Sequence, residues 1–204
     1  MAAVISATSI CNEALVFLGE IPLLDFPENS QNSDRCAVYY ERVKVSELKK
    51  HPWNFAKARM ELTLDSVNPP FEYAHQFIVP ADLLKLVNVY PIGRSWRREI
   101  LSDGSQRILA NTNTLEISYI RDVPESVFCP TFAPVVSARL AMLLAHTLTE
   151  RRDRYVAAVE WYDDSLSEAR RVDSQEMSVD EVMETSVVLV RNNRDEAFFY
   201  RPLA

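Results

Sequence analysis

The stretch His51-Pro52-Trp53-Asn54-Phe55-Ala56 separates two parts of the chain that differ in hydrophobic period. Before it, apolar residues recur every three or four positions, as in an amphipathic helix; from Met60 onward they alternate, as in a strand. Pro52 ends the preceding helix, because a proline ring clashes with the helical backbone before it. Trp53 and Phe55 are large apolar side chains, and we expect them to fix the helix end to the core where the chain enters a β-rich region.

Two helices are predicted before this stretch. The first lies between Ser6 and Gly19, where Gly19 and then Pro22 are stop signals, and its apolar positions are Ile10, Ala14, Leu15, Phe17 and Leu18. The second, longer helix covers residues 30–50 and carries its apolar stripe at Cys36, Tyr39, Tyr40, Val43 and Leu48. Both helices therefore have one face suited to packing.

Short strands are predicted after the stretch. Alternation or β-prone composition marks residues 61–64, 76–80, 86–90, 96–101, 106–110 and 114–120. Asp103-Gly104 lies between two of these segments, and glycine supplies the positive φ that a tight β-turn requires, so a hairpin is expected there.

Prolines at 124, 130 and 134 then mark a return to helix. Residues 132–149 are apolar on nearly all sides, as in a helix at the middle of a bundle. The following helix, from the basic cluster at 151–154 to about residue 170, has one apolar stripe and one charged face.

The predicted fold class is therefore α+β. It consists mainly of an α-helical bundle of about four helices with an inserted small antiparallel β subdomain and an extended C-terminal arm. The expected bounds are 1–59 and 124–174 for the bundle, 60–123 for the β subdomain and 175–204 for the arm.

The C-terminal arm has the composition of a docking segment. It combines a β-prone run with a cluster of large aromatic side chains, which are costly to expose and typically mark interaction sites. We predict a partner-binding site at Val187, Val188, Leu189, Val190, Phe198, Phe199 and Tyr200.

Composition argues against several functions. Three glycines are too few for a phosphate-cradling loop, and a formal charge of −7 disfavours a protein that grips duplex DNA. The N-terminus lacks a basic leader and no apolar run approaches a membrane span, so we expect synthesis and residence in the cytoplasm. Three cysteines without a C-x-x-C pair predict buried, reduced thiols: Cys11, Cys36 and Cys129.

No catalytic, cofactor-binding or metal-ligating residue is predicted. His51, His75 and His146 fall in three different predicted environments, so a triad or metal site is not expected. A glycan hydrolase would need two carboxylates, which Asp163 or Asp164 with Glu168 could supply, but acids at this spacing on a charged helix favour a solvated face.

Two arginine groups could face phosphate or another subunit. Arg151, Arg152 and Arg154 lie near Arg139 in the predicted bundle, and the β subdomain carries Arg94, Arg97 and Arg98. The acids interleaved with them favour salt-bridged surface or subunit contact over nucleic-acid binding.

Several short motifs in a fixed order carry a resemblance to a known family. They are Ile10-Cys11-Asn12-Glu13-Ala14-Leu15 with Leu18-Gly19, Cys36-Ala37-Val38-Tyr39-Tyr40, and His51-Pro52-Trp53-Asn54-Phe55-Ala56-Lys57-Ala58-Arg59. Later landmarks are residues 73–80, Asp82-Leu83-Leu84-Lys85, Leu166-Ser167-Glu168-Ala169-Arg170 and Asp173. Over residues 8–174 the sequence resembles the tail tubular protein A family of short-tailed (podovirus-type) phages, with His51, Pro52, Trp53, Asn54 and Phe55 as its structural signature.

The resemblance implies a structural protein of the virion tail or neck and no enzyme activity. Such a head-to-tail adaptor forms a homo-oligomeric, dodecameric ring between the portal protein and a tail nozzle of the tail tubular protein B type. The ring is assembled in the host cytoplasm and encloses the phage DNA without reading its sequence during ejection. A glycan-degrading tail hydrolase, and a different head-completion or DNA-binding module, are the alternatives.

Overall fold

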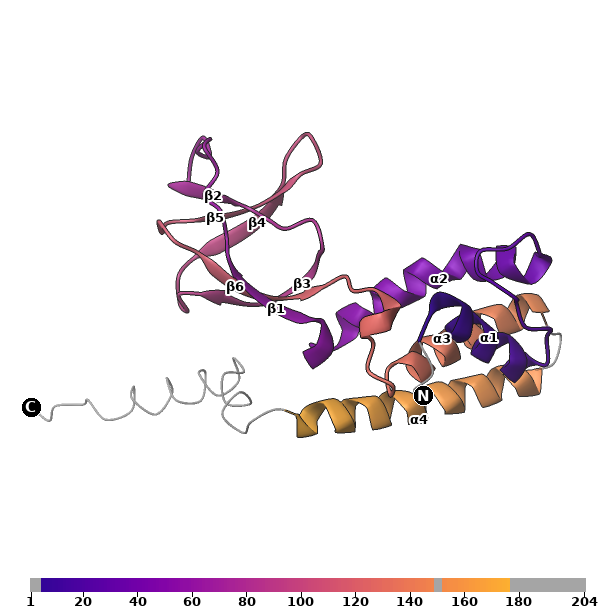
Figure 1. The fold of residues 1–204 in the computed structure, drawn as a ribbon. Coiled ribbons are helices and arrows are strands. Elements are labelled where there is room, and N and C mark those ends of the chain that lie inside the picture. Colours follow the sequence, from indigo (N-terminus) through magenta and orange to yellow (C-terminus); the bar gives the residue numbers. More distant parts are fainter. Residues whose placement is uncertain (1–4, 149–151, 177–204) are drawn as a thin grey trace, which may run out of the picture.

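The computed structural model describes residues 5–148 and 152–176 and has the predicted α+β class. Its four helices are α1 (Ala7–Leu18), α2 (Gln31–Lys50), α3 (Ala133–Leu148) and α4 (Arg152–Gln175). Six strands lie between α2 and α3, so the β subdomain is an insertion in the helical bundle (Figure 1).

Local capping signals set the ends of the first two helices. Ser6 and Ser9 form a reciprocal capping box at the start of α1, and Ser30 accepts a hydrogen bond from the Ser33 N–H at the start of α2. Gly19 ends α1 in the left-handed conformation, with φ of 82°, which a glycine adopts without steric cost. The two predicted helices are confirmed within a residue of their expected ends.

Helix α3 lies at the centre of the bundle. It packs against α1, α2 and α4, and its buried side chains occupy most of its circumference. This confirms the prediction from its nearly all-round apolar sequence, since a helix without a polar face must be covered on every side.

Two three-stranded antiparallel sheets form the β subdomain. One sheet has the order β1 (Lys57–Glu61), β6 (Glu116–Arg121), β3 (Leu83–Tyr90), and the other has the order β2 (His75–Ile78), β5 (Gln106–Ala110), β4 (Trp96–Ile100). A second, smaller core lies between the sheets, with Phe77 and Ile108 from one and Ile117 and Tyr119 from the other. The opposite face of the first sheet contributes Ile120 to the bundle core.

The strand predictions are confirmed in number and mostly in position. The predicted hairpin is β4–β5, with Gly104 at φ of 82° in the turn. The strand expected at 61–64 is wrong in position, because β1 starts at Lys57, ahead of the expected boundary at residue 60, to pair with β6. Leu64 forms only an isolated bridge to Phe77.

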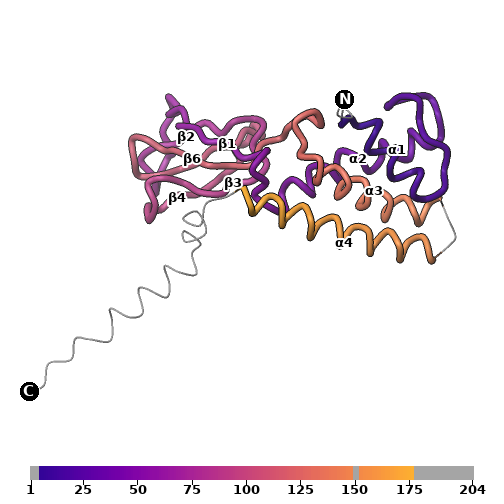
Figure 2. Tube along the Cα trace, turned by 60° about the horizontal axis from the view of Figure 1, so that its bottom comes forward, coloured from indigo at the N-terminus to yellow at the C-terminus, as the bar shows by residue number. Residues whose placement is uncertain are grey.

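The bundle and the β subdomain lie end to end (Figure 2). Helix α4 runs along the bundle, and its C-terminal end lies near the β subdomain in both views (Figures 1 and 2). Among the described residues, no helix is both long and apolar enough to cross a membrane. The C-terminal arm beyond residue 176, including the predicted partner-binding residues Val187–Val190 and Phe198–Tyr200, lies outside the described residues.

Candidate functional site

The chain passes twice between the bundle and the β subdomain, at residues 51–57 and 121–127, and we call these two crossings the neck. Short 3-10 turns occur in both, at Asn54–Ala56 and Glu125–Val127. The neck determines how the two parts of the molecule are held together. It also contains the predicted structural signature, His51 to Phe55.

In the first crossing, the signature residues bind the last turns of α4 through Asp173. The Asn54 backbone N–H donates to Asp173 Oδ1 at 2.9 Å, and Asn54 Nδ2 donates to the Asp173 carbonyl oxygen at 2.8 Å. His51 Nε2 lies 3.0 Å from Asp173 Oδ2. Asp173 is buried, so the contacts from the Asn54 N–H and His51 replace water that its carboxylate has lost, and the Asn54 side chain satisfies its carbonyl oxygen.

Trp53 is the apolar anchor of the same crossing. It is fully buried, and its indole N–H donates to the Glu47 carbonyl oxygen at 3.0 Å. Its ring lies 4.9 Å from Phe132 and 4.6 Å from His51, while Phe55 packs on Phe128 and Phe132. The predicted anchoring role of Trp53 and Phe55 is therefore confirmed: they tie the end of α2 to the start of α3.

The second crossing is held by a buried lysine. Lys44 Nζ, on α2, lies 3.3 Å from Glu125 and 3.6 Å from Asp122, and Tyr40 donates to Glu125 at 2.9 Å. Burial opposes ionisation of Glu125, but hydrogen bonds from its own backbone N–H, Tyr40 and Lys44 outweigh it and lower the pKa of the carboxyl. Burial likewise opposes the charge of Lys44, yet Glu125 and Asp122 raise its pKa.

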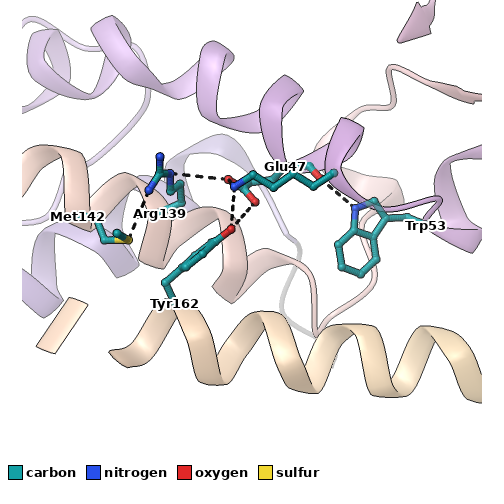
Figure 3. A network of polar contacts seen from close by, with 6 residues as sticks. Glu47, Trp53, Arg139, Met142 and Tyr162 are labelled. Carbon is teal, nitrogen blue, oxygen red and sulfur yellow. Dashed lines mark hydrogen bonds and ion pairs between the residues drawn. The ribbon is translucent and has the colours of Figure 1, made fainter. Parts of the chain in front are cut away.

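A third polar group lies inside the bundle, on the neck side of α2 (Figure 3). The Glu47 carboxylate is fully buried, and its oxygens accept from Lys50 at 2.6 Å and from the Tyr162 hydroxyl at 3.0 Å. Arg139, on α3, lies 3.8 Å from Glu47, with its guanidinium over the Tyr162 ring. Burial opposes the Lys50 charge, but hydrogen bonds to Glu47 and Tyr162 raise its pKa.

This group joins three helices. Glu47 and Lys50 belong to α2, Arg139 to α3 and Tyr162 to α4. Glu47 was not among the residues predicted from sequence, although it falls on the apolar stripe of α2, four residues after Val43 and seven after Tyr40. A charged residue on a buried stripe is the signal that could have identified it, because such a residue must be paired inside the fold.

The three histidines lie in separate environments, as predicted. His51 is in the neck, His75 is on β2, and the His146 ring lies tilted against the Tyr155 ring with 4.9 Å between the ring centroids. Within residues 5–148 and 152–176, no group of three or more His, Cys, Asp or Glu side chains is placed to hold a metal ion.

The carboxylates that a glycan hydrolase could have used lie on the surface. Asp163, Asp164 and Glu168 are exposed on α4, and Glu168 pairs with Arg171 at 2.7 Å. The prediction of a solvated face is confirmed for these residues.

Most of the arginines considered as phosphate ligands contact protein groups. Arg97 pairs with Glu72 at 3.4 Å, Arg98 donates to Gln106, and Arg154 donates to the Phe17 carbonyl oxygen at 3.0 Å. Arg139 is held by Glu47, as described above. Arg151 lies outside the described residues.

Cys11 and Cys36 are buried and their thiols lie side by side, whereas Cys129 is half-buried. The hydrogen bond with Cys36 and burial together raise the pKa of the Cys11 thiol, so it stays protonated. The prediction of buried thiols is correct for these two and only partly so for Cys129. Their proximity could not be read from positions 25 residues apart.

Comparison with known proteins returns no family. No protein-family model matches the sequence, and no curated protein matches it.

Proposed function

We propose that this chain is a structural head-to-tail adaptor of the tail tubular protein A type. Copies assemble as a ring, expected to be dodecameric, between the portal protein and the tail nozzle of a short-tailed phage. The ring joins head to tail in the virion and encloses the DNA path. It acts through its shape and its contacts, without catalysis.

The observation that carries the proposal is the contact between two landmarks of the resemblance. His51 and Asn54, in the signature motif, bind Asp173, the last landmark of the resemblance. These residues are more than a hundred positions apart. A chance likeness in composition would not be expected to bring them into contact, whereas a shared architecture would.

The chemistry of the buried polar groups also favours a structural role. Glu47, Glu125 and Asp173 each join side chains or backbone from different elements. Groups used in this way hold helices and crossings in place, which suits a subunit that must keep its shape under load during DNA packaging and ejection. The same groups give no reason to prefer the hydrolase alternative.

A ring is the closed form of a repeated, heterologous contact between copies. With a net charge of −7 per copy, such a ring is strongly acidic, and an acidic lumen would repel DNA phosphates and let DNA pass. A ring structure with a lumen lined mainly by Arg and Lys would contradict this placement of charge.

The proposal is tested by the mass of the full chain, alone and mixed with its cognate portal ring, measured by native mass spectrometry. We expect a species of about twelve copies, formed alone or only on the portal. A chain that stays monomeric and leaves the portal mass unchanged would contradict the adaptor function. Deleting residues 185–204 should weaken docking while leaving the monomer folded; unchanged docking would exclude the arm as the partner-binding segment.

A further inference from the structure

Strand β4 is an edge strand with an open side. It lies at the end of the sheet β2-β5-β4 and, among the described residues, pairs only with β5, in continuous register from Trp96 to Ile100. The Leu101 N–H donates to the Ser105 carbonyl oxygen in the same register. Because hydrogen-bonded pairs alternate along an antiparallel ladder, Arg97 and Glu99 bond to β5, and the backbone groups of Trp96, Arg98 and Ile100 face outward.

The same three residues share one face of the sheet, on which Trp96 and Ile100 leave apolar surface uncovered on either side of Arg98. Their cross-strand partners include Ala110 and Ile108, which are buried in the core between the two sheets. Paired residues share a face of the sheet, so Trp96 and Ile100 lie on this inner face. They are nevertheless 41% and 71% exposed.

The edge strands β2 and β3 differ from β4: the outer side of β2 is partly hydrogen-bonded, and β3 has an irregular register. The outer side of β2 bonds to the segment before it, with the Ile78 N–H donating to Thr63 at 2.9 Å and the Asp65 N–H donating to Gln76 at 2.9 Å. Strand β3 has two register shifts, which bend an edge strand. All five residues of β4 are exposed, and its register has no shift. Such an edge is a template for another strand.

A segment suited to this edge follows α4. Residues 187–190 are Val-Val-Leu-Val, without proline or glycine, and have high strand propensity. Before them, residues 176–184 carry Glu176, Asp180, Glu181 and Glu184 and no basic residue. Arg94 precedes β4, and Arg97 and Arg98 lie on it beside Glu99, so the region around this strand carries the opposite net charge.

The neck determines where the chain leading to this segment begins. Asp173 binds Asn54, so α4 ends at the base of the β subdomain. Ten residues, 177–186, separate the described part of α4 from Val187. An extended chain of that length spans up to about 35 Å, so residues 187–190 are not confined to the base of their own β subdomain.

We propose that residues 187–190 of one copy add as a strand to the free edge of β4 in a second copy, with Val and Leu side chains covering Trp96 and Ile100. Main-chain hydrogen bonds to Trp96, Arg98 and Ile100 supply the affinity, and the apolar side chains of Trp96 and Ile100, on either side of Arg98, set the register. This inference rests on the proposed function in that it names the contact between neighbouring subunits. The contact is heterologous, so its repetition builds a ring when the rotation closes.

The first test blocks the edge in the full chain. Arg98→Pro removes an outward N–H without removing a bond to β5, while Arg98→Thr removes the same charge and keeps the edge. We expect the protein concentration needed for self-association to rise about tenfold in Arg98→Pro and to change less than about twofold in Arg98→Thr, by sedimentation velocity. Equal effects would overturn the proposal. Circular dichroism checks that both variants fold.

The second test locates the added strand and does not depend on a proline. Full chains carrying Cys129→Ser and either Arg98→Cys or Val188→Cys are mixed and oxidised; Val38→Cys, on an exposed position of α2, replaces Arg98→Cys in the control. A disulfide-linked pair formed with position 98 and not with position 38 is expected. No link, or equal links, would overturn the proposal.

A third variant, which carries both Arg98→Cys and Val188→Cys in one chain, tests which copy supplies the strand. A link formed only within one chain would overturn the assignment to a second copy. Assembly on the portal without any link would leave the adaptor function standing and remove only the β4 contact, so the two failures are distinguishable.

Discussion

The helical bundle and the β subdomain differ in the size of their cores and in how their backbone hydrogen bonds are satisfied. In the bundle, α3 is surrounded by three helices and even the carboxylate of Glu47 is buried and paired. In the β subdomain, a small core lies between two three-stranded sheets, and Trp96 and Ile100 remain exposed beside an open edge. Helices satisfy their backbone hydrogen bonds internally, whereas a short open sheet leaves edge groups for other chains. The β subdomain therefore has an edge suited to contact between copies.

The largest expected effect follows from removing the anchor between the two regions. Trp53→Ala leaves a large cavity and an unpaired Glu47 carbonyl oxygen, so the free energy of unfolding should fall by about 3–5 kcal/mol. The matched control is Trp96→Ala on β4, expected to cost less than about 1 kcal/mol because that ring is half exposed. Urea unfolding measures both. Similar losses for the two tryptophans would contradict the contrast between a closed bundle and an open β edge.

A second, smaller effect is expected inside the bundle. Glu47→Gln keeps the shape of the side chain but leaves Lys50 and Arg139 without their buried counter-charge. Because both cations are about one-third exposed and can turn toward water, we expect a loss of about 2 kcal/mol rather than the larger cost of a wholly buried ion. Glu168→Gln, on the exposed face of α4, is the control and should change stability by less than about 0.5 kcal/mol. A neutral Glu47→Gln would show that the network does not hold the three helices.

The neck contact to α4 should have an intermediate effect. Asp173→Ala removes the acceptor of the Asn54 N–H and the partner of His51, and we expect a loss of about 1.5 kcal/mol in thermal or urea unfolding. Asp164→Ala, exposed on the same helix, should be nearly neutral. In a double-mutant cycle, Asn54→Ala and Asp173→Ala should be non-additive. Additive losses would mean that the two residues do not act as one contact.

The smallest effect concerns pH and the second crossing. The folded-state pKa of Glu125 is lowered, so its contribution to stability is present above the pKa of the unfolded chain and is lost as pH falls through the folded value. Above about pH 5 the contribution is complete. Because the group is partly exposed, we expect less than about 1 kcal/mol. Glu125→Gln should flatten the acid side of the curve of stability against pH, and an unchanged acid side would exclude this carboxylate as its source.

Much of the fold could be predicted from sequence because its signals are local. Ser6, Ser30 and Gly19 cap helices through neighbouring backbone groups, and the Asp103-Gly104 turn closes a hairpin between adjacent strands. The pairing of β6 with β1 and β3 could not be predicted, because it joins segments separated by long stretches of chain. The early start of β1 at Lys57 could not be predicted either, because it depends on the pairing of β1 with the distant strand β6.

The candidate site was predicted only in part. The anchoring by Trp53 and Phe55 followed from their size and their place after Pro52, since large apolar side chains at a helix end must be buried. The partners of His51 and Asn54 did not follow, because Asp173 lies on another helix at the far end of the chain. The Cys11–Cys36 contact likewise depends on how α1 packs beside α2.

Amide hydrogen exchange of the full chain, free and mixed with its cognate portal ring, tests most directly whether the β subdomain carries the contact between copies. The account predicts that the outward amides of Trp96, Arg98 and Ile100 exchange more slowly in the assembled ring, while amides in α3 are unchanged. An assembled ring in which residues 96–100 exchange as fast as in the free chain, or a portal that leaves exchange unchanged everywhere, would contradict it.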